Sequence, residues 1–124
     1  MINLALTDPN PLSLVPSTDE IGHGTMLAGI AAGSLDESQN FRGAAPKTEL
    51  VVVKLAQAKA FNRAVFRIPD NVICYPESNI LIGIEYIKKV ANQLKRPVVL
   101  CVGLGSSQGS HEGHSALTSY LDNL

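Results

Sequence analysis

Two short apolar runs decide the fold that this chain is expected to adopt: residues 50–55, Leu-Val-Val-Val-Lys-Leu, and residues 98–102, Val-Val-Leu-Cys-Val. Continuous runs rich in β-branched residues are typical of strands buried on both faces of a parallel sheet. Between them, apolar residues recur at helical spacing from Ile80 to Leu94, which predicts an amphipathic helix. Strand, helix and strand in this order predict a βαβ crossover and therefore an α/β fold.

The composition indicates one ordinary domain at most. The chain has 124 residues, 45% of them apolar, and its 10 basic and 11 acidic side chains give a formal net charge of −1. This balance argues against nucleic acid or an anionic membrane as the main partner. No stretch approaches the ~20 apolar residues of a membrane span. Cys74 and Cys101 lack the spacing of a disulfide framework or a thiolate zinc site, so we expect two free thiols.

The remaining segments differ in how much structure they predict. Residues 1–20 are rich in turn formers and indicate an approach segment. Small and apolar residues from His23 to Ala32 predict a helix that can pack closely, with Gly33 as its stop. Residues 56–77 have mixed charge and no clean period, which indicates a long, partly ordered insertion. Residues 115–124 predict the opening turns of another amphipathic helix.

The sharpest chemical feature is a histidine between two glycines, Gly22-His23-Gly24, directly before the small-residue helix. Glycines on both sides allow a substrate to approach the imidazole closely, as a general base requires. Taken alone, the same pattern also fits a structural histidine at a helix cap. The local motif leaves both interpretations open.

Three blocks in the same order resemble those of the subtilisin-like serine proteases. Residues 22–33, Gly-His-Gly-Thr-Met-Leu-Ala-Gly-Ile-Ala-Ala-Gly, resemble the histidine block of that family. Residues 41–55 look like its G-V-A-P-x-A-x-L-x-x-V-K strand entry, and residues 96–105 look like its V-I-N-x-S-L-G strand, with Gly103 where serine is usual. The sequence from Gly103 to Ser115 is most similar to the clostridial branch that includes the spore-germination (Csp-type) proteases.

The resemblance implies an α/β three-layer sandwich with a parallel sheet, incomplete in this chain. It places His23 in the position of the general base, which moves a proton from a serine nucleophile to the leaving amine. It also implies that Gly103, Leu104 and Gly105 line the substrate cleft and pair their backbone with an extended peptide or protein substrate. Calcium binding by the full-length protein, and an extracellular or spore-associated location in a Gram-positive bacterium, are further expectations from the family.

The two other blocks that a catalytic triad needs are not found in this sequence. No Asp-Thr-Gly or Asp-Ser-Gly follows an apolar strand before His23, where Asp8 and Asp19 lie in turn-rich sequence, and no Gly-Thr-Ser-Met-Ala follows later. Residues 1–124 therefore look like a single partial domain, from the histidine block to the helix after the substrate-cleft strand. We expect this chain alone to be inactive, and its two strands to pair directly or, preferentially, to cause self-association.

Two other functions stay open at this point. A non-catalytic pseudoprotease, which binds or signals through the same fold, would carry the same blocks. A small nucleotide-binding α/β module would suit the crossover, although the glycines at 103, 105 and 109 have the wrong spacing for a phosphate loop. His111-Glu112-Gly113-His114 lacks the spacing of a zinc-binding HExxH helix and indicates a polar loop. The sequence therefore predicts neither a metal site nor a cofactor in this chain.

Overall fold

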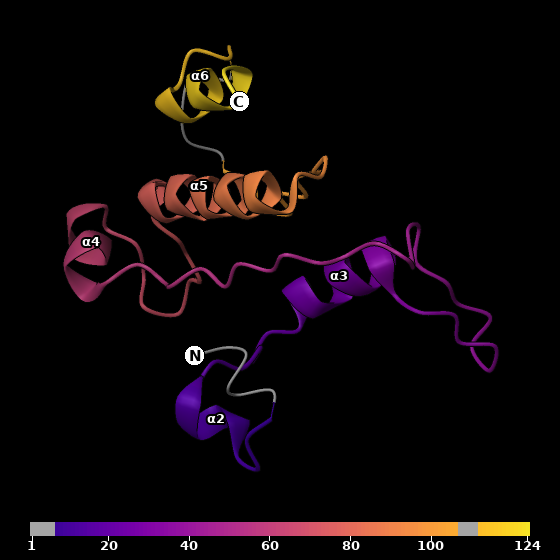
Figure 1. The fold of residues 1–124 in the computed structure, drawn as a ribbon. Helices are drawn as coiled ribbons and strands as arrows, with labels where there is room; N and C mark the ends of the chain where they lie inside the picture. Colours follow the sequence, from indigo (N-terminus) through magenta and orange to yellow (C-terminus); the bar gives the residue numbers. More distant parts are fainter. Residues whose placement is uncertain (1–6, 107–111) are drawn as a thin grey trace. The chain divides into compact units, whose positions relative to one another are not determined.

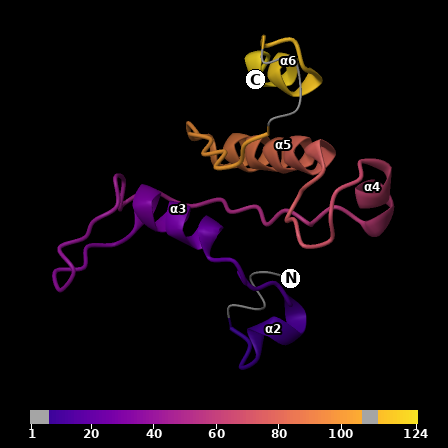
Figure 2. The same cartoon turned by 180° about the vertical axis from the view of Figure 1, so that it is seen from behind.

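The computed structural model of the chain describes residues 7–106 and 112–124, which divide into two compact units, residues up to 50 and residues from 51 on. Each unit is described by itself. The first contains α2 (Pro11–Leu14) and α3 (His23–Ala32), and the second contains α4 (Ala60–Val65), α5 (Glu77–Leu94) and α6 (Ala116–Asp122) (Figure 1). Figure 2 shows the same helices from behind. Within the described ranges, no helix combines the length and apolarity that crossing a membrane requires.

The predicted parallel sheet is not formed by the residues that the structure describes, so the expected three-layer α/β sandwich is wrong. Residues 50–55 and 98–102 are irregular, and they do not pair with each other as strands. The β-type pairing recorded in residues 7–106 and 112–124 is an isolated antiparallel bridge between Asp36 and Phe41. A strand is formed only when a neighbouring backbone accepts and donates its hydrogen bonds. The apolar runs predicted burial, but they carried no information about a pairing partner.

One side of the first apolar run packs against α5. Val51, Val53 and Leu55 are half-buried, whereas Val52 between them is 71% exposed. A Cβ atom added at Gly83 of α5 would lie 3.1 Å from Cγ1 of Val53, so helix and run are in close contact. The expected burial of this run on two faces is therefore wrong, because α5 covers one face alone.

Helix α5 confirms the prediction made from its apolar spacing. Ile84, 3% exposed, is the buried apolar side chain at its centre. The helix begins at Glu77, three residues before the predicted Ile80, because Pro76 at the N-cap fixes an extended backbone and Glu77 places a negative charge in the first turn. It ends after Leu94, where Lys95 adopts a left-handed φ of 53°.

The predicted partly ordered insertion, residues 56–77, is organised around one buried arginine. Arg63 of α4 donates from Nη1 to the carbonyl oxygen of Pro69 (2.9 Å) and from Nε to that of Ala58 (3.3 Å). The Ala58 N–H in turn donates to the carbonyl oxygen of Cys74 (2.9 Å), so the two ends of the segment lie side by side. One side chain thus holds together a segment whose sequence shows no period.

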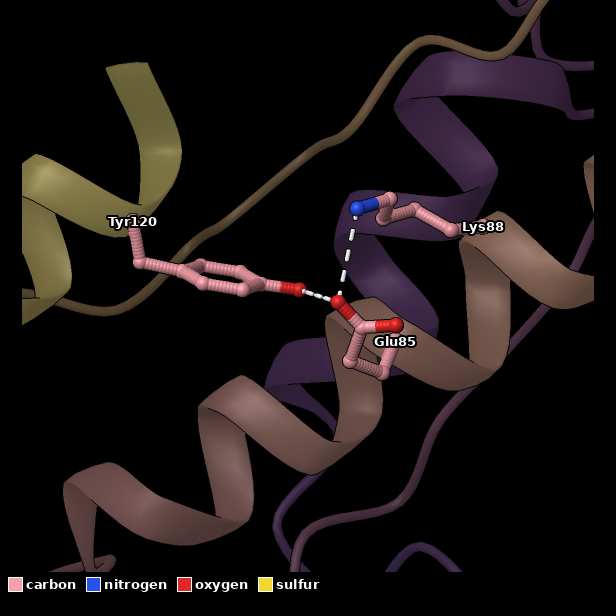
Figure 3. Close-up of polar contacts among 3 residues, drawn as sticks. All are labelled: Glu85, Lys88 and Tyr120. Atoms are coloured by element: carbon pink, nitrogen blue, oxygen red, sulfur yellow. Dashed lines mark hydrogen bonds and ion pairs between the residues drawn. The ribbon is translucent and has the colours of Figure 1, made fainter. Parts of the chain in front are cut away.

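Helix α6 is capped by its own sequence and is tied to α5 by one polar cluster. The Ser115 hydroxyl accepts a hydrogen bond from the Thr118 N–H (3.1 Å), as expected of a serine N-cap. The Tyr120 hydroxyl donates to Oε1 of Glu85, and Nζ of Lys88 lies 3.4 Å from the same oxygen (Figure 3). The bond to Glu85 raises the pKa of Tyr120 to about 12, and the bond from Tyr120, followed by that from Lys88, lowers the pKa of Glu85.

Candidate active site

His23 is the first residue of α3, and the helix has the bounds that the sequence predicts, His23–Ala32. Gly22 at the N-cap has a φ of 81°, a left-handed conformation that a residue with a Cβ atom rarely adopts. The Gly22 carbonyl oxygen accepts the first helical hydrogen bond, from the Met26 N–H (2.9 Å). The chain therefore turns sharply at Gly22 and leaves His23 exposed at the start of the helix.

The carboxylate of Asp19 holds this turn in place. Its Oδ1 accepts hydrogen bonds from the N–H groups of Ile21 (3.1 Å) and Gly22 (2.8 Å), and its Oδ2 accepts from the N–H (3.1 Å) and hydroxyl (2.6 Å) of Thr25. These bonds, that of the Thr25 hydroxyl foremost, hold the pKa of Asp19 well below its usual range. Asp19 is thus an anion that bonds the backbone on both sides of His23.

A return segment closes the other end of α3. The N–H groups of Gly43, Ala44 and Ala45 donate to the carbonyl oxygens of Gly33 (3.0 Å), Ile30 (2.9 Å) and Ala31 (2.8 Å). The last carbonyl groups of a helix have no hydrogen-bond donor within it, so the N–H groups of residues 43–45 supply the donors that the end of α3 lacks. The helix that carries His23 is therefore fixed at both ends by hydrogen bonds.

Two glycines make this close approach possible. A Cβ atom on Gly43 would collide with the nitrogen of Gly33 and lie 2.9 Å from the carbonyl oxygen of Gly29. A Cβ atom on Gly33 would lie 2.5 Å from that same oxygen. Gly33 ends the helix as predicted, but its φ of −59° is not left-handed. Glycine is required at position 33 because neighbouring backbone atoms lie too close to leave room for a side chain.

The predicted substrate-binding residues Gly103, Leu104 and Gly105 lie in an irregular, exposed segment of the second unit. Leu104 is 41% exposed, and a Cβ atom added at Gly105 would meet no atom within 4 Å. This segment is therefore open to solvent. His23 belongs to the first unit, and its assignment and that of residues 103–105 both stay predictions.

Two other features of the described residues offer little to a ligand. A depression of about 620 Å³ runs along α5, lined by Glu85, Lys88, Lys89, Asn92 and Gln93. It is an exposed helix surface and contains none of the predicted site residues. Among residues 7–106 and 112–124 there is no group of three His, Cys, Asp or Glu side chains that could hold a metal ion. His111 of the histidine pair lies outside the described residues.

Asp19 is not among the site residues that the sequence predicts. Helix caps are sought at the residue directly before the helix, and that position is occupied by Gly22, which has no side chain to offer. The available signal was the spacing of Asp19, three residues before a glycine and six before a threonine with a hydroxyl donor.

Comparison with known proteins identifies the family. Residues 8–120 match the model of the subtilase family. The chain belongs to the subtilase family. Its structure is similar to that of the CspB protease from Clostridium perfringens, with a TM-score of 0.75 and 29% sequence identity over 98% of this chain. None of the curated proteins matches.

Membership of the subtilase family confirms the resemblance that the three sequence blocks indicated. The chain spans 24% of the CspB chain that it matches. A TM-score compares backbone positions and does not require paired strands. This subtilase match is therefore compatible with the absence of a sheet among the described residues.

Proposed function

We propose that the full-length protein is a serine endopeptidase that hydrolyses peptide bonds through an acyl-enzyme, with His23 as its general base. His23 takes the proton of the serine hydroxyl as the serine oxygen attacks the scissile carbonyl carbon, and then gives that proton to the leaving amine. Water then attacks the acyl group: His23 takes a proton from the water and gives it to the serine oxygen, which leaves as the hydroxyl. The observation that carries this proposal is an exposed histidine fixed at the first turn of α3 in a chain of the subtilase family.

Residues Gly103, Leu104 and Gly105 bind the substrate in this proposal. Pairing of an extended peptide with a protein backbone needs an accessible strand edge and little side-chain bulk. The support is the exposure of this segment and the open space around Gly105. In the full-length protein, Gly105→Val should raise KM for long peptides much more than it lowers the melting temperature. A loss of folding with normal binding in the folded fraction would make these glycines packing residues.

The chain of 124 residues alone is expected to be inert, because a general base without its nucleophile cannot form an acyl-enzyme. Incubation with a fluorophosphonate probe tests this expectation, and we expect neither labelling of a serine nor cleavage of casein. Stoichiometric labelling of a serine in this chain would contradict it.

A variant of the full-length protein tests the role of His23. His23→Ala should lower turnover by several orders of magnitude, as is typical for loss of a triad member. His114→Ala is the matched control, because His114 is an exposed histidine in the loop before α6. Peptidase activity of His23→Ala equal to that of the unaltered protein would remove His23 from the mechanism.

The full-length protein also tests the two alternatives. A protein that binds peptides without cleaving them would be a pseudoprotease, and one that binds nucleotide instead would favour the nucleotide-binding alternative.

The location and the metal content are also proposals. An extracellular or spore-associated place in a Gram-positive bacterium is supported by the similarity to a protease from Clostridium perfringens. Calcium in the full-length protein is expected from the family alone, and the described residues of this chain provide no cluster that fits it. No step of the reaction above requires a metal.

A further inference from the structure

The carboxylate of Asp19 is committed to four hydrogen-bond donors, and all of them belong to the turn that carries His23. One oxygen accepts from the N–H groups of Ile21 and Gly22, before the histidine, and the other accepts from the N–H and the hydroxyl of Thr25, after it. The first turn of α3 is thus bonded from both sides to a single group.

This arrangement differs from an ordinary helix cap. A cap residue directly precedes the helix and bonds one or two N–H groups within it. Asp19 bonds the helix at Thr25 and also the two residues that lead into it, Ile21 and Gly22. Asp19 therefore bonds the backbone both where the chain enters α3 and within the first turn of the helix, on either side of His23.

The turn would be poorly determined without that carboxylate. Gly22 has no Cβ atom to restrict its backbone, and Gly24 on the other side of the histidine has none either. Glycines give the substrate access to the imidazole, but they also leave the histidine between two of the most flexible residues available. Asp19 removes the freedom that the glycines introduce.

We propose that Asp19 is a positioning residue for peptide hydrolysis, which fixes the first turn of α3 so that the His23 imidazole is presented in one orientation. The inference rests on the proposed function of His23 as general base. Asp19 acts through the backbone and through Thr25. The bond from the Thr25 hydroxyl is the shortest of the four that the Asp19 carboxylate accepts, at 2.6 Å. Thr25 is therefore the partner of Asp19 in this role. Catalysis depends on such placement, since a misplacement of about 1 Å can cost roughly a hundredfold in rate.

The first experiment needs no enzymatic activity. In the chain of 124 residues, NMR relaxation of the His23 backbone and imidazole, and exchange of the Thr25 amide, are compared between the unaltered protein and Asp19→Ala. We expect increased mobility of His23 and faster exchange at Thr25. The matched control is Asp36→Ala, because Asp36 bonds its own turn in the same way, through Ser38 and Gln39, and should leave His23 unchanged. A His23 that stays equally ordered in Asp19→Ala overturns the proposal.

The second experiment uses the full-length protein and separates kcat from KM. Asp19→Ala should lower kcat about 10–100-fold with KM nearly unchanged, since the substrate-binding segment is untouched. Thr25→Val should have a similar but smaller effect, and Thr25→Ser, which keeps the hydroxyl, should restore kcat. The double variant Asp19→Ala/Thr25→Val should be no slower than Asp19→Ala alone, because both changes break the same contact.

The outcomes distinguish this inference from the proposed function. If Asp19→Ala mobilises His23 and leaves kcat as it was, Asp19 is a structural cap and the proposal is wrong. A fall in the melting temperature without a change in kcat at a temperature where the protein is folded leads to the same conclusion. If neither the unaltered full-length protein nor any variant hydrolyses peptides, the proposed function fails and the catalytic meaning of Asp19 fails with it, whereas the NMR comparison still decides whether Asp19 orders His23.

Discussion

The replacement of Gly43 by alanine should loosen the helix that carries His23. A Cβ atom at this position would collide with the nitrogen of Gly33 and lie 2.9 Å from the Gly29 carbonyl oxygen, where ordinary contact begins at 3.4 Å. These are backbone atoms, and the Gly33 nitrogen is the closer of the two, so the segment itself must move back by roughly 1 Å to reach ordinary contact. Such overpacking typically costs about 1–3 kcal/mol.

The displacement acts on three hydrogen bonds at once. The N–H groups of Gly43, Ala44 and Ala45 lie 2.8–3.0 Å from their acceptors at the end of α3 and would be stretched beyond the usual range. Each such bond contributes about 0.5–1.5 kcal/mol net. Alanine also restricts the unfolded chain, which offsets about 0.4–1 kcal/mol. We therefore expect a loss of about 2 kcal/mol in the stability of this contact.

Amide hydrogen exchange measures this loss at the bonds concerned. A difference of about 2 kcal/mol corresponds to roughly thirtyfold faster exchange at Ala44 and Ala45. The matched control is Gly29→Ala in the same helix, where an added Cβ atom meets nothing within 4 Å. That variant should be more stable by about 0.5–1 kcal/mol, because glycine is unfavourable inside a helix. Unchanged exchange at Ala44 and Ala45 in Gly43→Ala would refute the reasoning.

Three further predictions concern the second unit. Because the bond to Glu85 raises the pKa of Tyr120 to about 12 from 10.0, the contact between α6 and α5 should be at full strength below pH 10 and weaken as the pH rises toward 12. A near-ultraviolet titration should show this pH dependence, and Tyr120→Phe should abolish it. Arg63→Met should cost about 1–3 kcal/mol locally and open residues 56–77 to limited proteolysis, and Arg63→Lys should not restore protection, because one ammonium group cannot reach the same carbonyl groups. Val52 and Val99 are 71% and 94% exposed, so the chain should self-associate in sedimentation experiments, and lysine at both positions should return it to a monomer.

Helices α3, α5 and α6 were predictable because their signals are local, whereas the short helices α2 and α4 lie in segments predicted as an approach segment and a partly ordered insertion. The spacing of apolar residues located α5, and the small residues followed by Gly33 gave the bounds of α3. A helix satisfies its own backbone, so a few neighbouring residues contain most of the information. A strand depends on a partner that is distant in sequence, and the runs at 50–55 and 98–102 therefore predicted a sheet that the described residues do not form.

The candidate site divides in the same way. His23 was found from its own neighbours, Gly22 and Gly24, and from the family block that contains them. Asp19 was not found, because its importance lies in which backbone groups converge on its carboxylate, and that becomes visible only when the turn is folded. The reason for Gly43 was hidden for the same reason, since the atoms that exclude a side chain there come from a different part of the chain.

The hydrogen bond between the Ala58 N–H and the Cys74 carbonyl oxygen has an evolutionary consequence. Together with the bond from Asn79 Nδ2 to the Ala56 carbonyl oxygen (3.1 Å), it makes the chain leave and return at nearly the same place. The entropic cost of closing a loop grows only slowly with its length. Residues can therefore be gained or lost between Ala58 and Cys74 at little cost in stability to the elements on either side. We expect relatives to differ in length here more than elsewhere, and replacement of residues 59–73 by a short turn should leave α5 intact.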